Sequence, residues 1–145
     1  MNGPKIYFHA LNISFNIAHK KLLNGWIAHT LSKENKSGGN FNFIFCDDTY
    51  LLEINKKYLS HDSYTDIITF DYSENNLVGG DIFISIERVK ANAVEYNTQF
   101  ERELYRVIIH GILHLCGYKD KTKLEKAQMR AKEDFYLNYF NTPHV

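Results

Sequence analysis

Three consecutive helix-like segments in the second half of the chain constrain the fold more than any other feature. Apolar residues at helical spacing predict helices over Glu87–Tyr96, Phe100–Cys116 and Leu124–Tyr139. The strand-like segments all come earlier in the chain. Strands followed by a block of helices favour an α+β domain.

The first part of the chain supplies the sheet. β-Branched and aromatic residues predict four strands, at Lys5–His9, 41–46, 65–72 and 79–86. Turn-forming residues between the last two strands predict a hairpin. Helices are predicted over Ala18–Lys33 and over 47–59, the second with acidic residues at its start. The turn-rich segments 35–40 and 71–80 are the expected flexible places. We therefore predict a small mixed sheet of about four strands with about five helices.

Length and composition limit the class of protein. With 145 residues, 44% hydrophobic and 14% aromatic, the chain has the size of one folded domain, so we predict a single domain over 1–145. Seventeen basic residues balance seventeen acidic ones, so net charge does not indicate a nucleic-acid binder, although local patches govern phosphate contacts. We see no secretory signal and no apolar run of the roughly 20 residues that a membrane span needs. We expect a cytoplasmic protein without a membrane partner.

The stretch HGILHLCGYKD at residues 110–120 carries the chemistry. Residues four apart on a helix lie about 40° apart around its axis, so His110 and His114 can chelate one ion, as in HxxxH zinc motifs. Gly117 stands where helices often end, and the reversal there can bring Asp120 back toward the imidazoles. Two nitrogens and a carboxylate oxygen, with water in the fourth position, are typical of a catalytic zinc site. We predict one Zn²⁺ per chain at this helix C-terminus; the alternative is two core histidines and a loop acid.

Cys116 is a tempting fourth ligand, but helix geometry argues against it. It follows His114 by two residues and so lies about 200° around the axis, on the opposite face. We interpret Cys116 and Cys46 as buried free thiols, which fits a reducing compartment.

Several segments of the chain resemble a known family. HGILHLCGYKD resembles the signature of the YbeY family of metal-dependent bacterial endoribonucleases, approximately H-G-x-L-H-L-x-G-Y-D-H. INKKYL (54–59), TDIITF (65–70) and GGDIFIS (79–85) resemble the family's L-N-x-x-Y-R, T-D-V-L-S-F and L-G-D-I-x-I-S segments, in the same order. The match runs from about Phe41 to Arg130, some two-thirds of the chain.

The resemblance implies an activity, a cofactor and partners. It implies a zinc-dependent endoribonuclease that cleaves single-stranded RNA. In the family this activity is tied to ribosomal RNA processing (maturation of the 16S rRNA 3′ end) and to ribosome quality control. The implied partners are ribosomal RNA and the ribosome or ribosome-assembly proteins, and no DNA is expected.

Two departures from the family motif affect the site. Without a gap, the family's third histidine falls on Asp120 and its preceding acid on Lys119; with a gap, Asp120 aligns with the acid and the third ligand is lost. Leu59 stands where the family has an arginine, which would suit phosphate contact. His61, or Lys119 and Lys121 beside the metal, are candidates for part of that role, and His61 is also a candidate general base. Six basic residues between Lys119 and Lys132 suit phosphate recruitment, although a solvated helix face explains them equally well.

The same residues are also compatible with other functions. The spacing H-x3-H-x2-G-x2-D is also that of metzincin metalloproteases, but Gly111 replaces the glutamate that those enzymes use as general base. Two histidines and a carboxylate also form the facial triad of iron oxygenases, usually borne by the strands of a barrel. A non-catalytic, ribosome-associated metal-binding module is the third alternative, because the arginine is absent at Leu59.

Overall fold

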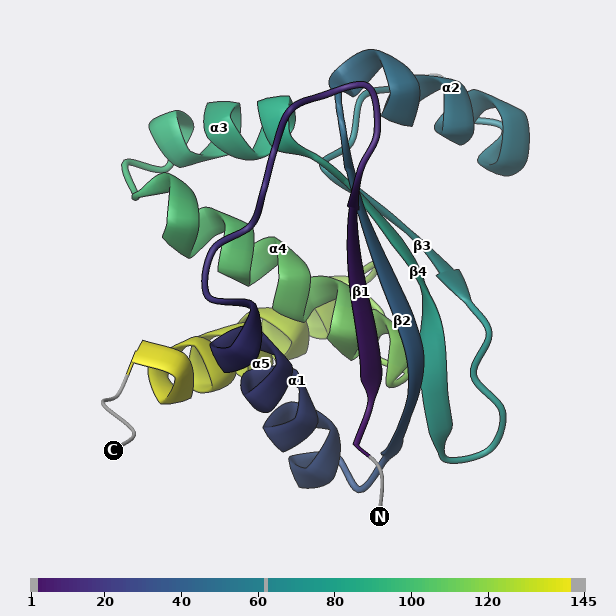
Figure 1. The fold of residues 1–145 in the computed structure, drawn as a ribbon, viewed down its shortest axis with the longest axis vertical. Coiled ribbons are helices and arrows are strands. Elements are labelled where there is room, and N and C mark those ends of the chain that lie inside the picture. The colour runs from purple at the N-terminus through teal and green to yellow at the C-terminus, as the bar shows by residue number, and fades with distance from the viewer. Residues whose placement is uncertain (1–2, 62, 142–145) are drawn as a thin grey trace.

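The computed structural model describes residues 3–61 and 63–141, which form one small α+β domain. Its nine elements are β1 (Lys5–Ala10), α1 (Lys20–Lys33), β2 (Ser37–Cys46), α2 (Asp48–Leu59), β3 (Ile67–Asp71), β4 (Leu77–Ser85), α3 (Ile86–Glu95), α4 (Phe100–Leu115) and α5 (Lys123–Asn141). The strand order is β1-β2-β4-β3, with β3 antiparallel to β4 and the other pairs parallel (Figure 1). The mixed sheet, the five helices and the β3–β4 hairpin confirm the predicted fold class.

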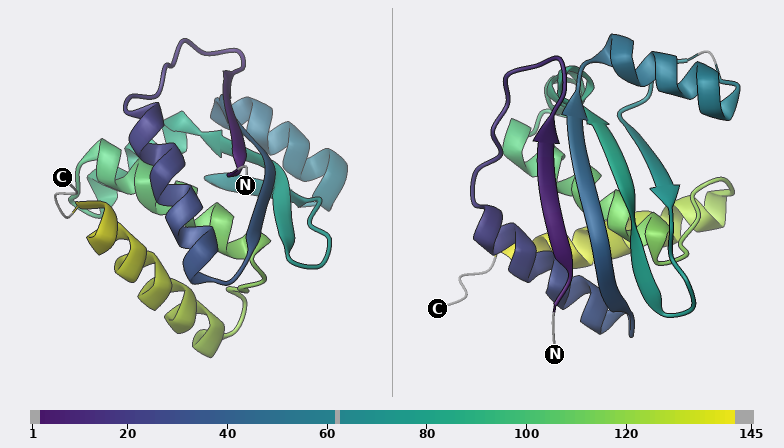
Figure 2. Two further views of the ribbon diagram at one scale, coloured as in Figure 1. Left: turned by 60° about the horizontal axis from the view of Figure 1, so that its bottom comes forward. Right: turned by 45° about the vertical axis from the view of Figure 1, so that its right-hand side comes forward.

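The helices cover the two faces of the sheet unequally. The main core lies between one face and α1, α4 and α5, whereas α2 covers part of the other face (Figures 1 and 2). Alternation along the strands produces this division, because successive side chains point to opposite faces. Ile82 and Ile84 of β4 are fully buried in the main core, and Phe83 between them packs in the small cluster under α2.

The sheet extends into segments that the sequence marks as flexible. Residues 37–40 form the start of β2, where Ser37 pairs with Leu77 and Gly38 with Val78. A Cβ on Gly38 would lie 2.6 Å from the Cβ of Pro4, so a residue without a side chain lets the strand approach the N-terminal segment. The turn-forming residues of this segment therefore lie in a paired strand, and Gly38 allows a close approach to the residue before β1. In the hairpin, only 72–76 remain as a connection.

No helix in the described ranges combines the length and the apolar character that crossing a membrane requires.

Candidate metal centre

Helix α4 packs against the sheet through its buried apolar face, and both histidines lie beside that face. Ile108, Ile112 and Leu113 are fully buried. A Cβ on Gly111 would lie 2.9 Å from Ile67 Cδ1, so the glycine lets the helix pack closely against the sheet. The side chains of His110 and His114 remain 21% and 25% exposed, because helical spacing places both beside the buried stripe. Both imidazole rings are therefore accessible to a ligand from the solvent side of the helix.

The end of α4 returns the chain to the histidines as the sequence predicts. Gly117 has φ 110°, its N–H donates to His114 O, and the N–H of Tyr118 donates to Leu113 O. This pair of bonds is the Schellman motif, which ends helices at a left-handed glycine. The reversal places Asp120 Oδ2 3.3 Å from His110 Nε2 and 3.4 Å from His114 Nε2.

Hydrogen bonds on the far side of each ring orient both imidazoles. His110 Nδ1 lies 2.7 Å from Glu133 Oε2, and His114 Nδ1 lies 2.9 Å from the carbonyl oxygen of Tyr118. Both partners are acceptors, so each Nδ1 carries the proton and donates it. In the neutral imidazole each Nε2 therefore carries the lone pair on the side of Asp120, which is how metal-binding histidines are commonly held.

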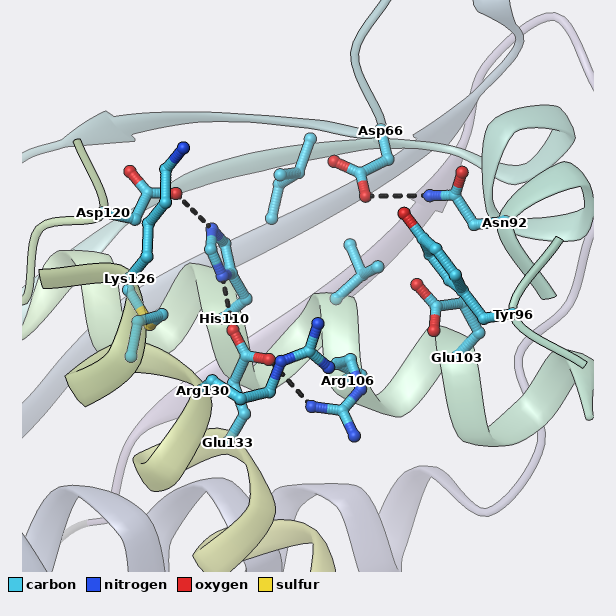
Figure 3. Close-up of a pocket in the computed structure, with 13 residues that line it drawn as sticks. Asp66, Asn92, Tyr96, Glu103, Arg106, His110, Asp120, Lys126, Arg130 and Glu133 are labelled. Atoms are coloured by element: carbon cyan, nitrogen blue, oxygen red, sulfur yellow. Dashed lines mark hydrogen bonds and ion pairs between the residues drawn. The ribbon is translucent and has the colours of Figure 1, made fainter. Parts of the chain in front are cut away.

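A buried ion pair supports His110. Glu133 is 5% exposed, and its Oε1 accepts from Arg106 Nη1 at 2.9 Å, while Arg106 Nη2 donates to Asp134 at 3.0 Å (Figure 3). Burial by itself lowers the pKa of His110, but the hydrogen bond and charge of Glu133 and the charge of Asp120 outweigh it and raise that pKa. The sequence contains no local signal for Glu133, because its role depends on how α5 crosses α4.

A second carboxylate fixes the loop that carries Asp120. Glu34, at the end of α1, accepts from the hydroxyls of Tyr118, at 2.7 Å, and of Tyr136. Burial tends to raise the pKa of Glu34, but these hydrogen bonds and Lys132 lower it below its usual value. Since the carbonyl of Tyr118 orients His114, Glu34 and Glu133 each support one histidine.

The three converging side chains fit a small cation. One atom each from His110, His114 and Asp120 lies within 4.8 Å of the others, and the two nitrogen–oxygen separations are 3.3 and 3.4 Å. Ligand atoms at a tetrahedral zinc with bonds of about 2.0–2.1 Å are about 3.3–3.4 Å apart. This group could therefore hold a metal ion, with two imidazole nitrogens and one carboxylate oxygen as donors.

Two cavities meet at this group. The first, of about 360 Å³, lies among α3, α4 and α5 (Figure 3). The second, of about 430 Å³, lies between residues 63–69, with His61, and the two histidines of α4. They share the lining residues Asp66, Ile67, His110 and Asp120. Volumes of this size are at the lower end of those typical of small-ligand sites, roughly 300–1,000 Å³.

The other candidate residues divide between the cavity and the surface. His61 and Leu59 line the second cavity, which His110 and His114 also line. Lys119 is exposed and lines neither cavity, so the structure does not bring it into the site.

Asp66 lines both cavities, although no pattern in the sequence assigned it a role. Asn92 donates to its Oδ2 at 3.1 Å, and burial raises the pKa of this carboxyl. The signal that could have found it is its place just before a strand, in TDIITF, next to the segment that carries His61.

A small α+β domain with a helix-borne group that could hold a metal ion, placed where two cavities meet, fits a hydrolase. The family model described as Endoribonuclease YbeY matches residues 7–141. An Endoribonuclease YbeY of Flavobacterium psychrophilum is 52% identical over 89% of this chain and 92% of its own, and that of Christiangramia forsetii is 48% identical over 97% and 98%. A Thermotoga maritima protein with a known solution structure, 28% identical, superimposes with a TM-score of 0.63 over 93% of this chain and 88% of its own. The chain belongs to the YbeY family of endoribonucleases, which are hydrolytic nucleases.

We expect Cys116→Ser to leave metal binding unchanged. Cys116 is partly buried against the main core, outside the converging group, and burial raises the pKa of its thiol to about 12. Cys116 follows His114 by two residues, so helix geometry turns its sulfur away from the face that carries the two imidazoles. We expect the same metal content by elemental analysis and a decrease of about 1 kcal/mol in the free energy of unfolding. Loss of metal from this variant would refute the assignment of Cys116 to the core.

Proposed function

We propose that this protein is a zinc-dependent, single-strand-specific endoribonuclease whose metal ligands are His110, His114 and Asp120. The observation that carries the proposal is the convergence of two oriented Nε2 atoms and one carboxylate oxygen at tetrahedral separations. The junction of two cavities leaves room beside this group for a water molecule and a phosphodiester.

When bound, a zinc ion lowers the pKa of a coordinated water and polarises a phosphoryl oxygen. Glu133 and the Tyr118 carbonyl hold the two imidazoles in the tautomer that leaves Nε2 unprotonated. His61, in the second cavity, is the proposed general base, because imidazole is the side chain most often used for that role. Leu59 lines the same cavity and offers no charge to a phosphate there.

The proposed cellular role rests on what the resemblance to the family implies. We propose ribosomal RNA processing, at the 16S rRNA 3′ end, and ribosome quality control, with single-stranded rRNA as substrate and the ribosome or its assembly proteins as partners. We propose a cytoplasmic location, where these partners are found.

Of the rival functions, peptide hydrolysis is not favoured. Its general base would have to stand at position 111, and Gly111 faces Ile67 and Ile82 in the core rather than a cavity. A non-catalytic metal-binding module has one observation in its favour, which is the apolar Leu59 beside the candidate ligands.

Metal content and RNA cleavage together test the proposal. We expect about one zinc per chain in the wild type and none in His114→Ala, because two ligands bind far more weakly than three. We expect the wild type to cleave single-stranded RNA but not the matching duplex, with activity lost on chelation and restored by zinc. Zinc binding without cleavage would instead establish the non-catalytic module, and absence of zinc after incubation with the metal would refute both.

A further inference from the structure

The six basic residues between Lys119 and Lys132 differ in their position relative to the site. Lys126 and Arg130, one turn apart on α5, line the first cavity. Lys132 pairs with Glu34 at 3.4 Å, and Glu34 in turn binds Tyr118 in the loop that carries Asp120. Lys132 is therefore engaged by the support of that loop. The remaining three, Lys119, Lys121 and Lys123, are exposed and line neither cavity. Only two of the six cations therefore reach the space beside the metal-binding group.

Neither of these two cations is held by a direct ion pair in the described ranges, and the charge of Arg130 acts on Glu103 only at longer range. Within the described part of the chain, neither Lys126 nor Arg130 makes an ion pair or a side-chain hydrogen bond, whereas Arg106 in the same cavity is held by Glu133 and Asp134. Figure 3 shows both side chains rising from α5, across the cavity from Asp66. An incoming anion can thus bind them without breaking an existing pair.

The acidic residues of the first cavity do not cancel this charge. Glu133 is committed to Arg106 and His110, and Asp120 belongs to the metal-binding group. Asp66 and Glu103 remain, and burial raises the pKa of both carboxyls. They lie across the cavity from α5, where they offer acceptors to hydroxyl or amino groups. An anion in this cavity is therefore best placed on the α5 side, beside Lys126 and Arg130.

The second cavity has the opposite character. No lysine or arginine is among its lining residues in the described ranges, and Leu59 occupies one part of its wall. Tyr64, 58% exposed, lines it too, and its ring stacks on the guanidinium of Arg88 at 5.2 Å. This cavity, without a lysine or arginine among its described lining residues and with a supported aromatic ring, suits a base, and the first cavity suits a phosphate.

We infer that Lys126 and Arg130 form a subsite for an RNA backbone phosphate, next to the phosphate that is cleaved. The inference rests on the proposed function, which it extends by assigning the cationic contact to α5 rather than to α2. Lys126 and Arg130 sit four residues apart on one face of the helix and can share one phosphate or bind two successive ones.

Binding of an uncleavable strand tests the subsite. We would measure the affinity of the zinc-loaded protein for a short, fluorescent 2′-O-methyl oligouridylate over a range of salt concentrations, and verify on a gel that it stays intact. Each phosphate of a single strand that a cation neutralises contributes a slope of about −0.7 in log K against log salt. We expect Lys126→Ala/Arg130→Ala to weaken binding and to make the slope shallower by about 0.7 for each phosphate that the variant no longer neutralises.

The matched control is Lys121→Ala/Lys123→Ala, which removes the same charge from exposed positions outside both cavities. We expect its slope to stay within experimental error of the wild type, and both double variants to keep the wild-type circular dichroism. Equal weakening in the two double variants would mean diffuse attraction and overturn the subsite, as would no measurable binding by the wild type. Wild-type binding with the expected slopes but without RNA cleavage would refute the proposed function and leave the subsite standing.

Discussion

Asp120→Ala is expected to abolish tight zinc binding while leaving the fold intact. The carboxylate lies 3.3–3.4 Å from both Nε2 atoms and is the only bridge between them among the described residues of this group. Its side chain is 38% exposed on a loop, so its removal opens no cavity in the core. Removal of a supporting residue behind a ligand already costs about 10–100-fold in affinity, so we expect removal of the ligand itself to cost more than about 100-fold. Competition with a chromophoric chelator measures it.

Asp120→His is the matched variant for this position. Imidazole binds zinc as well as carboxylate does, and the family motif places a histidine at this position when aligned without a gap. We expect the variant to retain about one zinc per chain. Unchanged zinc affinity in Asp120→Ala would rule out the three-ligand site and support the alignment in which the third ligand is lost.

Glu133→Gln is expected to weaken zinc binding by about 10–100-fold, although residue 133 does not face the metal position. The carboxylate accepts from Arg106 through one oxygen and from His110 Nδ1 through the other. A glutamine amide has a single acceptor oxygen, so one of the two donors keeps an acceptor and the NH₂ group faces the other donor. If the NH₂ group faces His110, the ring proton moves to Nε2, where the metal would bind.

Asp134→Asn controls for the change in charge. Asp134 neighbours Glu133 on α5 and binds the other nitrogen of the same Arg106 guanidinium, but it does not touch His110. We expect its zinc affinity to remain within about two-fold of the wild type, in contrast to Glu133→Gln. Equal weakening in both variants would show that Glu133 acts through charge or stability rather than by orienting His110.

Local patterns predicted the elements of this fold, and pairing between distant segments set their limits. The periodicity of 100–116 and the glycine stop at Gly117 sufficed for α4 and its end, because both depend on residues within one or two turns. The start of β2 could not be predicted in this way. Residues 37–40 are turn formers, and only the pairing of Ser37 and Gly38 with residues 77–78 and of Asn40 with Lys5 makes them a strand.

The sequence by itself determined the three side chains that converge, since helix geometry and the glycine reversal fix His110, His114 and Asp120 relative to one another. That they bind zinc remains a prediction. Only the tertiary structure decided what surrounds them. Two of the supporting residues come from other elements: Glu34 follows α1, and Glu133 lies on α5, where it binds Arg106 of α4. The spacing of residues along a chain does not encode how these helices cross. The same holds for the basic residues, because only the packing of α5 against α4 turns Lys126 and Arg130 toward the cavity and leaves Lys119 on the surface.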